Sequence, residues 1–417
     1  MNRMSSPDAR DLPERLFVWG LVESIEYVEQ ESGERSKVVS IDAMASSDSA
    51  AFRTIRPEEI EGLRRIAILA PPNIEHPPLR RFFEVAREGA WVRLRVASTG
   101  RGPYCEIEGP YPSLRLTPEG DMPGPRLYRA RLRWGRLATK KEERRLRAIC
   151  LMLTEGHAAA PPAAAGGFLP GKIRILDAGQ AHCAEIYDRS RPDTVLGYFD
   201  VGRPISFLTA TWPTPAPVLN IPKKGFVFIS HWDYDHYSMA LAFAPGLQNL
   251  NWIAPIPVSP GPTVAALIKK LGASIALINL AQFVPGPGLE LHKGLGPPSD
   301  RNNSGYVLRV SLACGDVLLS GDVDYQFISP AAKSELKGVL APHHGANLVG
   351  APPPAAGGAG QVVFSFGDPN KYGHPHPTSI ASYAGLGWTL VATNWKSNAT
   401  LAPAAATALV FRDDFWF

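Results

Sequence analysis

The residues best suited to chemistry form one short segment, Ser230–His236, which reads Ser-His-Trp-Asp-Tyr-Asp-His. It follows an apolar run, Gly225–Ile229, whose residue types favour a buried strand. Two histidines and two aspartates therefore lie just beyond a strand end, where the chain turns and side chains can converge. Imidazole and carboxylate ligands together suit Zn²⁺, Mn²⁺ or Fe²⁺ better than Ca²⁺ or a thiolate site. The alternative, a polar loop with helix-capping aspartates, needs fewer ligand-type side chains than the segment offers.

Later segments place further ligand-type side chains near apolar runs. Asp322 follows Leu318–Gly321, and the adjacent His343 and His344 precede a glycine. His374 lies in a loop between a glycine and a proline. Each of these residues could instead be an ordinary turn residue. The position of Asp322 just after an apolar strand favours a place in a shared site.

Motifs across residues 172–400 resemble the metallo-β-lactamase-fold hydrolases. The segment Ser230–His236 is similar to the His-x-Asp-x-Asp-His metal motif in the soluble domain of ComEC-type DNA-uptake proteins. Six other segments match that family in the same order: Leu176–Gln180, Phe199–Gly202, Asn302–Leu308, Leu318–Asp322, Ala341–Gly345 and Asn370–Pro375. Each motif is weak alone, and their common order around the metal motif is what carries the resemblance.

The resemblance implies a four-layer αββα sandwich over residues 171–417 that holds one or two divalent metal ions, Zn²⁺ or Mn²⁺. Carried over by position, the ligands are His231 and Asp233 for one ion, Asp235, His236 and His344 for the other, and Asp322 as a bridge. The wider family has a further histidine between its first metal motif and its Gly-Asp motif. Only His292 is available here, in an unsuitable context, so catalysis by one ion stays open.

The resemblance also implies that Asp235, His343 and His374 act in catalysis. We favour His344 as the metal ligand and His343 as the group that faces the substrate, although the reverse order stays open. His374 would contact the substrate or transfer a proton to the leaving group. The reaction would be attack of a metal-bound hydroxide on phosphorus, since Zn²⁺ lowers the pKa of a bound water from ~15.7 to ~7.

Other residues are expected around the ligands. Asp177, Asp200 and Asn303 would support them from behind or cap turns, and Asp200 would orient a metal-bound histidine. Trp232, Tyr234 and Tyr372 are expected at the substrate, where aromatic rings wall a pocket or stack on a base. For Trp232 and Tyr234, packing in the interior is the alternative.

The first part of the chain predicts a second, smaller domain. Residues 1–13 are expected to be a disordered start, and residues 14–156 a β-rich domain with alternating strand patterns and a helix over 76–88. Short strands joined by glycine and polar turns favour a small barrel or sandwich, for example an OB-like one. The Ala/Pro/Gly-rich stretch 157–170 is interpreted as a linker.

A basic segment, residues 126–147, ends this domain. It holds ten arginines and lysines against two glutamates, with Tyr128 and Trp134 among them. Arg129, Arg131 and Arg133 alternate and are expected on one face of a strand. That face would contact substrate phosphates. The alternatives are a solvated surface or a docking surface for a protein partner.

Composition and charge argue against a bulk nucleic-acid binder and against a membrane protein. Hydrophobic residues make up 45% and charged residues 20%, as in ordinary globular proteins. The net charge of +4 is too small to indicate a protein that binds nucleic acid over much of its surface. Scattered cysteines, the lack of an apolar signal region and the lack of a run of ~20 apolar residues predict a cytoplasmic protein without a membrane partner. The Ala-, Pro-, Gly- and Arg-rich composition suits a bacterial source.

Together these features predict a metal-dependent hydrolase that cleaves phosphodiester bonds, with nucleic acid as the expected substrate. One alternative is a small-molecule phosphodiesterase that acts on a nucleotide, such as a cyclic nucleotide. Another is a scaffold subunit, in which the N-terminal domain binds a partner protein and the metal site is regulatory or silent. The intact set of ligand-type residues argues against a silent site.

Overall fold

The computed structural model describes residues 16–29, 35–46, 63–109, 126–156, 169–204, 211–367, 372–393, 409–411 and 414–416. The predicted disordered start, residues 157–168 of the predicted linker and Asn370 lie outside these residues. The chain divides into two compact units. Unit 1 comprises Met1–Glu155 and Ser259–Gly272, and unit 2 comprises Gly156–Val258 and Ala273–Phe417. The predicted domains did not place residues 259–272 with the N-terminal part.

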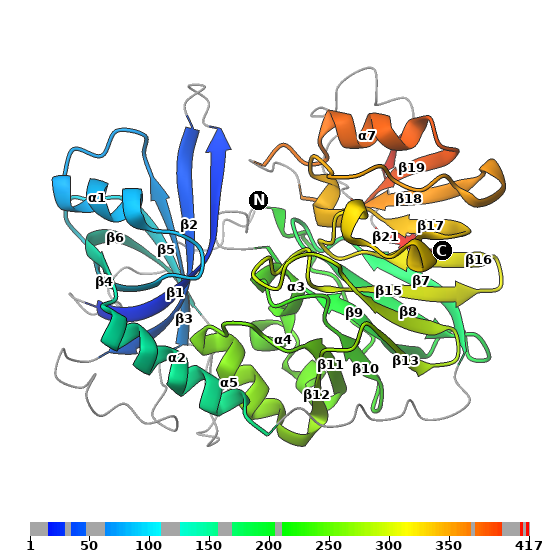
Figure 1. Cartoon of the computed structure of the whole chain (residues 1–417), viewed down its shortest axis with the longest axis horizontal. Coiled ribbons are helices and arrows are strands. Elements are labelled where there is room, and N and C mark those ends of the chain that lie inside the picture. The colour runs from blue at the N-terminus through cyan, green and yellow to red at the C-terminus, as the bar shows by residue number, and fades with distance from the viewer. Residues whose placement is uncertain are drawn as a thin grey trace. The chain divides into compact units, whose positions relative to one another are not determined.

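Unit 1 contains a closed barrel in the order β1-β2-β3-β5-β6-β4 (Figure 1). Its strands are β1 (Leu16–Glu29), β2 (Arg35–Ser46), β3 (Leu63–Ala70), β4 (Trp91–Ala97), β5 (Tyr104–Gly109) and β6 (Arg126–Leu137). Alternate residues such as Val18, Ile41 and Leu94 are buried in its core, as the period of two along a strand requires. Closure removes unpaired strand edges. The prediction of a small barrel is confirmed.

Helices α1, α2 and α5 lie in the described residues of unit 1. Helix α1 (Pro77–Val85) buries Leu79, Phe82 and Phe83, and it falls within the predicted 76–88. Helix α2 (Lys140–Thr154) begins with a capping box between Thr139 and Glu142 and packs on α5 (Pro262–Leu271). Both carboxylate oxygens of Asp42 on β2 accept the Thr263 N–H at the start of α5, at 2.9 and 3.1 Å. A buried carboxylate thus anchors α5 to the barrel.

Unit 2 contains two sheets (Figure 1). The first has the order β12-β11-β10-β9-β8-β7-β21 and the second the order β13-β14-β15-β16-β17-β18-β19-β20. Strands of the first are β7 (Pro170–Leu176), β8 (Cys183–Asp188), β9 (Val195–Val201), β10 (Phe226–Phe228), β11 (Asn251–Pro255), β12 (Ile275–Ile278) and β21 (Asp414–Trp416). Strands of the second are β13 (Gln282–Gly286), β14 (Leu289–Lys293), β15 (Tyr306–Leu312), β16 (Gly315–Leu319), β17 (Leu336–Leu340), β18 (Gly360–Phe364), β19 (Trp388–Ala392) and β20 (Leu409–Phe411).

The two sheets share one hydrophobic core, to which Ile186 and Phe228 contribute from the first sheet and Leu308 and Leu340 from the second. The opposite face of the second sheet packs against α6 (Pro330–Lys333) and α7 (Pro377–Ala384). Unit 2 is therefore a mixed α/β structure with two packed sheets. The full four-layer order stays a prediction.

Parallel pairing explains why polar residues meet at one edge of unit 2. Strands β9, β10 and β11 are parallel neighbours, so their carboxyl ends lie together. The same holds for β16, β17 and β18 in the second sheet. Ser230–His236 follows β10, Asp322 follows β16, and His343 and His344 follow β17. Within the described part of the chain, no helix is long and apolar enough to cross a membrane.

Candidate metal centre

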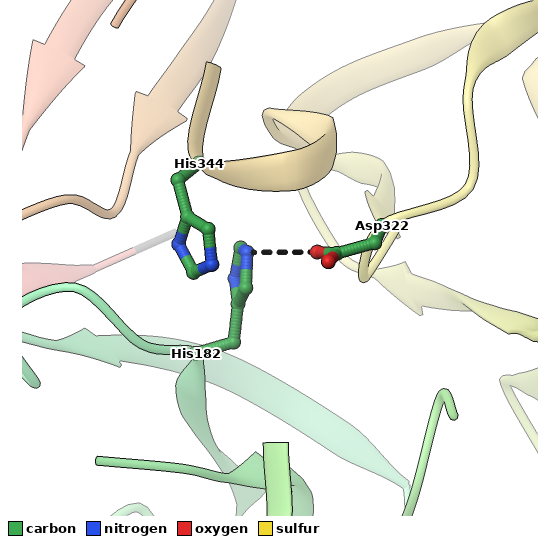
Figure 2. Close-up of side chains that lie close together, drawn as sticks. All are labelled: His182, Asp322 and His344. Carbon is green, nitrogen blue, oxygen red and sulfur yellow. Dashed lines mark ion pairs between the residues drawn. The ribbon is translucent and has the colours of Figure 1, made fainter. Parts of the chain in front are cut away.

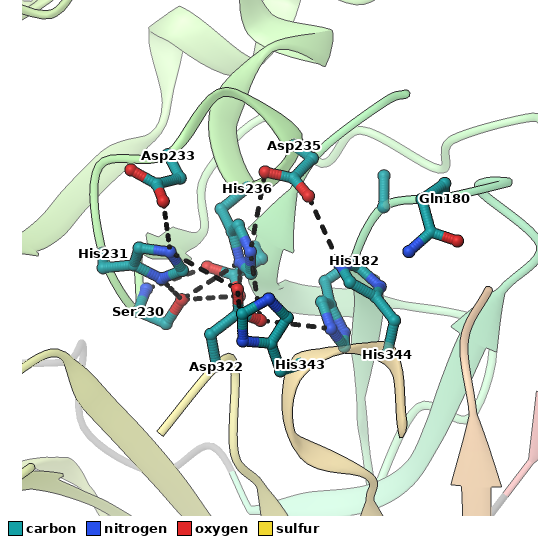
Figure 3. Close-up of polar contacts among 12 residues, drawn as sticks. Gln180, His182, Ser230, His231, Asp233, Asp235, His236, Asp322, His343 and His344 are labelled. Atoms are coloured by element: carbon teal, nitrogen blue, oxygen red, sulfur yellow. Dashed lines mark hydrogen bonds and ion pairs between the residues drawn. The ribbon is translucent and has the colours of Figure 1, made fainter. Parts of the chain in front are cut away.

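The metal motif begins where β10 ends and finishes in the short helix α3 (Tyr234–Tyr237). Asp233 is the residue before this helix, and its side chain makes no capping hydrogen bond. The helical turn places Asp235 and His236 next to one another and opposite the loops that follow β16 and β17 (Figure 3).

Five of the six predicted ligands gather in one cluster, together with His182. Three triads have ligand atoms within 4.8 Å of one another: His231, His236 and Asp322; Asp235, His236 and His344; and His182, Asp322 and His344. The His236 Nε2–Asp322 Oδ1 distance is 3.4 Å, and the His344 Nε2–Asp235 Oδ2 distance is 3.2 Å. Ligands about 2.0–2.2 Å from a tetrahedral metal ion lie roughly 3.4 Å apart, so the spacing suits an ion.

Buried polar atoms provide a second test of whether the cluster fits a metal ion. His231 Nε2, His236 Nε2, Asp322 Oδ1 and both ring nitrogens of His182 are buried and form no hydrogen bond with any described residue. Burying polar atoms in this way is unfavourable unless a partner satisfies them. A divalent cation is a partner that imidazole nitrogens and carboxylate oxygens share. The residues present therefore fit a metal ion.

Hydrogen bonds behind the cluster orient two of the histidines. His236 Nδ1 donates to Asp200 Oδ2 at 2.8 Å, which leaves Nε2 facing the cluster. His344 Nδ1 donates to the Ser365 carbonyl at 2.8 Å, which leaves its Nε2 facing Asp235. Such outer partners fix the tautomer of a metal-binding imidazole. Asp200 therefore contacts His236 as predicted for a residue that orients a ligand.

Backbone strain marks the same place. Asp200, His343 and His344 have φ values of 53°, 49° and 56°. Non-glycine residues rarely adopt this left-handed conformation, which costs on the order of 1–3 kcal/mol per residue. Both adjacent histidines of the His-His-Gly turn are strained. The fold therefore holds their side chains in fixed directions at a cost in local stability.

Charge is distributed unevenly within the cluster. Burial alone would raise the pKa of Asp322, but His236 and His343 hold that pKa well below its usual range. Burial opposes charge on His236 as well, yet Asp322, Asp200 and Asp235 raise its pKa well above the ordinary value. Burial and the neighbouring His344 lower the pKa of His182. In the metal-free protein these neighbours favour the protonated form of His236 and the neutral form of His182.

The remaining predicted ligand, Asp233, has a different partner. Its Oδ2 lies 3.4 Å from His231 Nε2, and its Oδ1 forms an ion pair with Arg301 Nη1 at 3.1 Å. Asp233 belongs to none of the three triads found among the described residues. The Arg301 guanidinium is thus a permanent cation paired with this carboxylate.

Two predicted supporting residues contact turns. Asp177 Oδ1 accepts the Gly179 N–H at 3.1 Å. Asn303 donates to Asp300 and accepts the Asp324 N–H. For these residues the structure shows the turn-capping alternative. Neither belongs to a metal-ligating triad among the described residues.

His343 and His374 lie beside the cluster. The His343 side chain is 40% exposed, and its Nδ1 is 4.0 Å from Asp322 Oδ2. His374 Nδ1 accepts from Gln180 Nε2 at 3.1 Å, and its ring centroid is 5.9 Å from that of His343. Tyr372 lies next to His374, with ring centroids 5.8 Å apart. His343 and His374 thus lie next to the cluster, and Tyr372 lies next to His374; their roles toward a substrate stay predictions.

Trp232 and Tyr234 are buried, at 4% and 1% exposure. Trp232 Nε1 donates to the Pro255 carbonyl at 2.7 Å, and the Tyr234 hydroxyl accepts from Arg203 at 3.0 Å. Both rings also pack against Tyr237. The structure therefore shows the packing alternative, and neither ring offers an open face for a base.

The predicted substrate-binding arginines belong to β6 in unit 1. Arg129 and Arg131 are exposed and pair in register with Glu106 and Tyr104 on β5. Arg133 lies at the point where the register of β6 against β4 shifts, and it donates to the Arg101 carbonyl at 2.7 Å. The regular alternation that placed all three on one face is interrupted there.

Sequence reasoning missed His182 and Arg301. His182 is a lone histidine between Ala181 and Cys183, without a spacing motif of its own. It reaches the cluster because its N–H donates to the Asp235 carbonyl at 3.2 Å and its carbonyl accepts the Gly202 N–H at 2.8 Å. Arg301 directly precedes the Asn302–Leu308 motif, and only the fold brings it to Asp233.

No protein-family model matches the sequence, and comparison with curated proteins finds no match. Among solved structures, the chain is similar to the metallo-β-lactamase-fold protein YhfI from Bacillus subtilis, with 13% identity, 59% of this chain and 99% of that chain covered, and a TM-score of 0.31. A metal-dependent hydrolase of the β-lactamase superfamily matches with 13% identity, coverage of 59% and 98%, and a TM-score of 0.33. The diiron β-hydroxylase CmlA from Streptomyces venezuelae matches with 13% identity, coverage of 88% and 65%, and a TM-score of 0.29. Because these TM-scores are low, the functional assignment rests on the residues of the site.

Proposed function

We propose that this protein is a metal-dependent hydrolase of the metallo-β-lactamase fold that cleaves phosphodiester bonds, with nucleic acid as its substrate. The observation that carries the proposal is the buried His/Asp cluster at the ends of β10, β16 and β17, whose ligand atoms have the spacing of a metal site. Nothing else in the described residues explains why so many polar atoms are buried there without hydrogen bonds.

We assign a separate role to each residue of the site. A bound divalent ion lowers the pKa of a coordinated water and offsets charge on a phosphoryl group. Asp235, His236, Asp322 and His344 hold that ion, and Asp200 keeps His236 in the tautomer that binds. His343 is exposed and contacts the phosphate or the leaving group.

His374 contributes as a neutral side chain. Burial and the neighbouring His343 and His344 lower its pKa well below the ordinary value. In the free protein near neutral pH it therefore has no proton to donate from an imidazolium. Its Nδ1 is already engaged by Gln180, so we assign Nε2 to contact with the substrate rather than to acid catalysis.

The choice of nucleic acid rests on exposed basic residues of unit 1. Arg129 and Arg131 project from β6, and the Arg131 guanidinium lies 5.7 Å from the centroid of the Tyr104 ring. Arginines beside aromatic rings are typical of surfaces that bind single-stranded nucleic acid. The same surface could instead dock a protein partner, and binding assays with single-stranded DNA separate the two.

A small-molecule phosphodiesterase is the second candidate, because several of the arginines already have partners. Arg136 forms a bidentate pair with Glu142, with both distances at 2.7 Å, and Arg131 and Arg133 donate to backbone carbonyls. Engaged guanidinium groups are less available to phosphates. A cyclic nucleotide would need few of them.

The experiment compares cleavage of bis-p-nitrophenyl phosphate, single-stranded DNA, RNA and a cyclic nucleotide by the purified protein with added Mn²⁺ or Zn²⁺. Asp235→Asn should lose at least about 100-fold in rate on the preferred substrate, since it removes a predicted ligand. Asp316→Asn is the matched control, because Asp316 pairs with Arg309 outside the cluster. A folded Asp235→Asn variant with full activity would contradict the proposal.

The two substrate classes separate in a second comparison. A double variant, Arg129→Ala with Arg131→Ala, should weaken DNA binding and reduce its salt dependence if the substrate is a nucleic acid. Hydrolysis of a cyclic nucleotide should be unchanged by these substitutions. Preference for the cyclic nucleotide with no effect of the arginines would favour the second candidate.

A further inference from the structure

His182 is a buried histidine that the proposed reaction has not yet used. It precedes β8, its side chain is fully buried, and its ring stacks on that of His344 with centroids 4.1 Å apart. Both ring nitrogens lack a hydrogen bond to any described residue. Figure 2 shows the ring between His344 and Asp322, with Nε2 directed toward the carboxylate at 3.6 Å.

Packing alone does not explain this residue. An aromatic or aliphatic side chain would fill the same space and leave no buried polar atom unsatisfied. Hydrogen bonds to Asp235 and Gly202 fix the backbone of His182, and its fully buried side chain stacks on His344. A buried imidazole that stacks on His344 and directs Nε2 toward the Asp322 carboxylate can offer that nitrogen to an ion held by both residues.

At the opposite end of the cluster, Asp233 is paired with a permanent cation. Asp233 is engaged by the Arg301 guanidinium, whose fixed positive charge lies 3.1 Å from one carboxylate oxygen. A metal ion close to Asp233 would have to share that carboxylate with a permanent cation. The end of the cluster with His182, Asp322 and His344 has no cationic arginine or lysine paired with its ligands in the described residues.

We propose that His182 is a further ligand of the ion that Asp322 and His344 hold, and that Asp233 is not required to retain the ion there. The proposal rests on the metal-dependent hydrolase function proposed above and adds a ligand to it. Two imidazoles and one carboxylate favour Zn²⁺, Fe²⁺ or Mn²⁺ over Mg²⁺ or Ca²⁺. Mg²⁺ would therefore be a poor competitor for this position.

The test measures metal binding directly, without reference to activity. The full-length protein is stripped with a chelator and loaded with Zn²⁺, and bound metal per chain and affinity are measured by elemental analysis and chelator competition. His182→Gln keeps a polar side chain, and His182→Phe keeps an aromatic ring without polar atoms. His292→Gln is the matched control, because His292 is also buried but contacts Glu290 outside the cluster.

We expect both His182 variants to lose one bound ion or to bind it at least 10-fold more weakly, while His292→Gln and Asp233→Asn retain it. Zn²⁺ should raise the melting temperature of the wild type more than that of either His182 variant. The metal-free His182→Phe variant should melt no lower than the metal-free wild type, since it removes two unsatisfied buried nitrogens.

Three results would overturn the proposal. Wild-type stoichiometry and affinity in a folded His182 variant would show that His182 is not a ligand. Loss of the ion in Asp233→Asn to the same extent would show that the ion lies at the other end of the cluster. A wild-type protein that binds neither Zn²⁺ nor Mn²⁺ would remove the proposed function as well, so the two failures are distinguishable.

Discussion

Replacing Asp200 with asparagine tests how the centre keeps His236 ready to bind a metal ion. Asp200 is fully buried and accepts hydrogen bonds from the Ser230 N–H, the Ser230 hydroxyl and His236 Nδ1, each at 2.8 Å. A carboxylate can only accept, so the hydrogen of the neutral imidazole stays on Nδ1 and Nε2 keeps a lone pair. In Asp200→Asn the amide can donate to Nδ1, which moves the imidazole hydrogen to Nε2 and directs an N–H at the metal position.

The size of the effect follows from the contacts that change. Loss of an outer partner of a metal-binding histidine typically weakens metal affinity about 10–100-fold, which corresponds to about 1.4–2.7 kcal/mol. The metal-free protein should lose about 1–3 kcal/mol of unfolding free energy, because one buried donor near Ser230 or His236 loses its acceptor. Metal affinity and metal-free stability are thus two separate readouts of one substitution.

The assay is competition between the protein and a chelator for Zn²⁺ near neutral pH, with denaturant unfolding of the metal-free protein alongside. Asp188→Asn is the control, since Asp188 is also buried but accepts from Ser190 and Arg191 outside the cluster. The reasoning is refuted if folded Asp200→Asn binds Zn²⁺ with wild-type affinity. It is refuted equally if Asp188→Asn weakens Zn²⁺ binding to the same extent.

Three further predictions concern pH and stability. The pKa of His236 in the folded protein is raised above its ordinary value of 6.5. The metal-free protein should therefore lose stability as the pH rises from about 6.5 through that folded pKa, which calorimetry at a series of pH values would show. Bound Zn²⁺ should abolish this loss. Burial raises the pKa of Asp42 to about 7, so ionisation of Asp42 should lower the stability of the folded state as the pH rises from about 4 to 7. Asp42→Asn should reduce this loss of stability in unfolding experiments, because asparagine cannot ionise and keeps an acceptor for the Thr263 N–H. Thr139→Ala removes the side-chain cap of α2 that pairs with Glu142 and should cost about 1 kcal/mol in denaturant unfolding, and an unchanged value would contradict the capping role.

Local patterns predicted the parts of the fold that depend on local chemistry. Alternation of apolar residues predicted strands at β1, β2, β4 and β5 of the barrel, while β3 was not predicted. Phe226–Phe228 were recognised as a buried strand because they are apolar throughout. The polar residues after β10, β16 and β17 were predicted to share a site because the motifs that contain them resemble those of a metal-binding family. The structure brings His231, His236, Asp322 and His344 together in that way.

Features that depend on tertiary contacts were not predictable from single segments. The packing of helix α5 on α2 and its anchor to Asp42 are long-range contacts that no local pattern encodes. His182 carries no motif, and its place in the cluster depends on backbone hydrogen bonds to Asp235 and Gly202. The pair between Arg301 and Asp233 likewise joins residues far apart in the sequence.

The burial of aromatic residues is a further case. Trp232 and Tyr234 alternate with ligand residues, so both substrate contact and packing were compatible with the sequence. Burial of both rings and their contacts with Tyr237 show that they pack in the interior. A residue type next to a ligand thus does not decide which way its side chain points.

The measurement that tests the central claim most directly is metal-dependent cleavage of bis-p-nitrophenyl phosphate by one purified sample whose metal content is determined at the same time. Our account predicts that the protein retains Zn²⁺ or Mn²⁺, loses activity when a chelator removes it, and regains activity when the ion is restored. A folded protein that binds neither ion, or whose hydrolysis is unaffected by complete removal of metal, would contradict it.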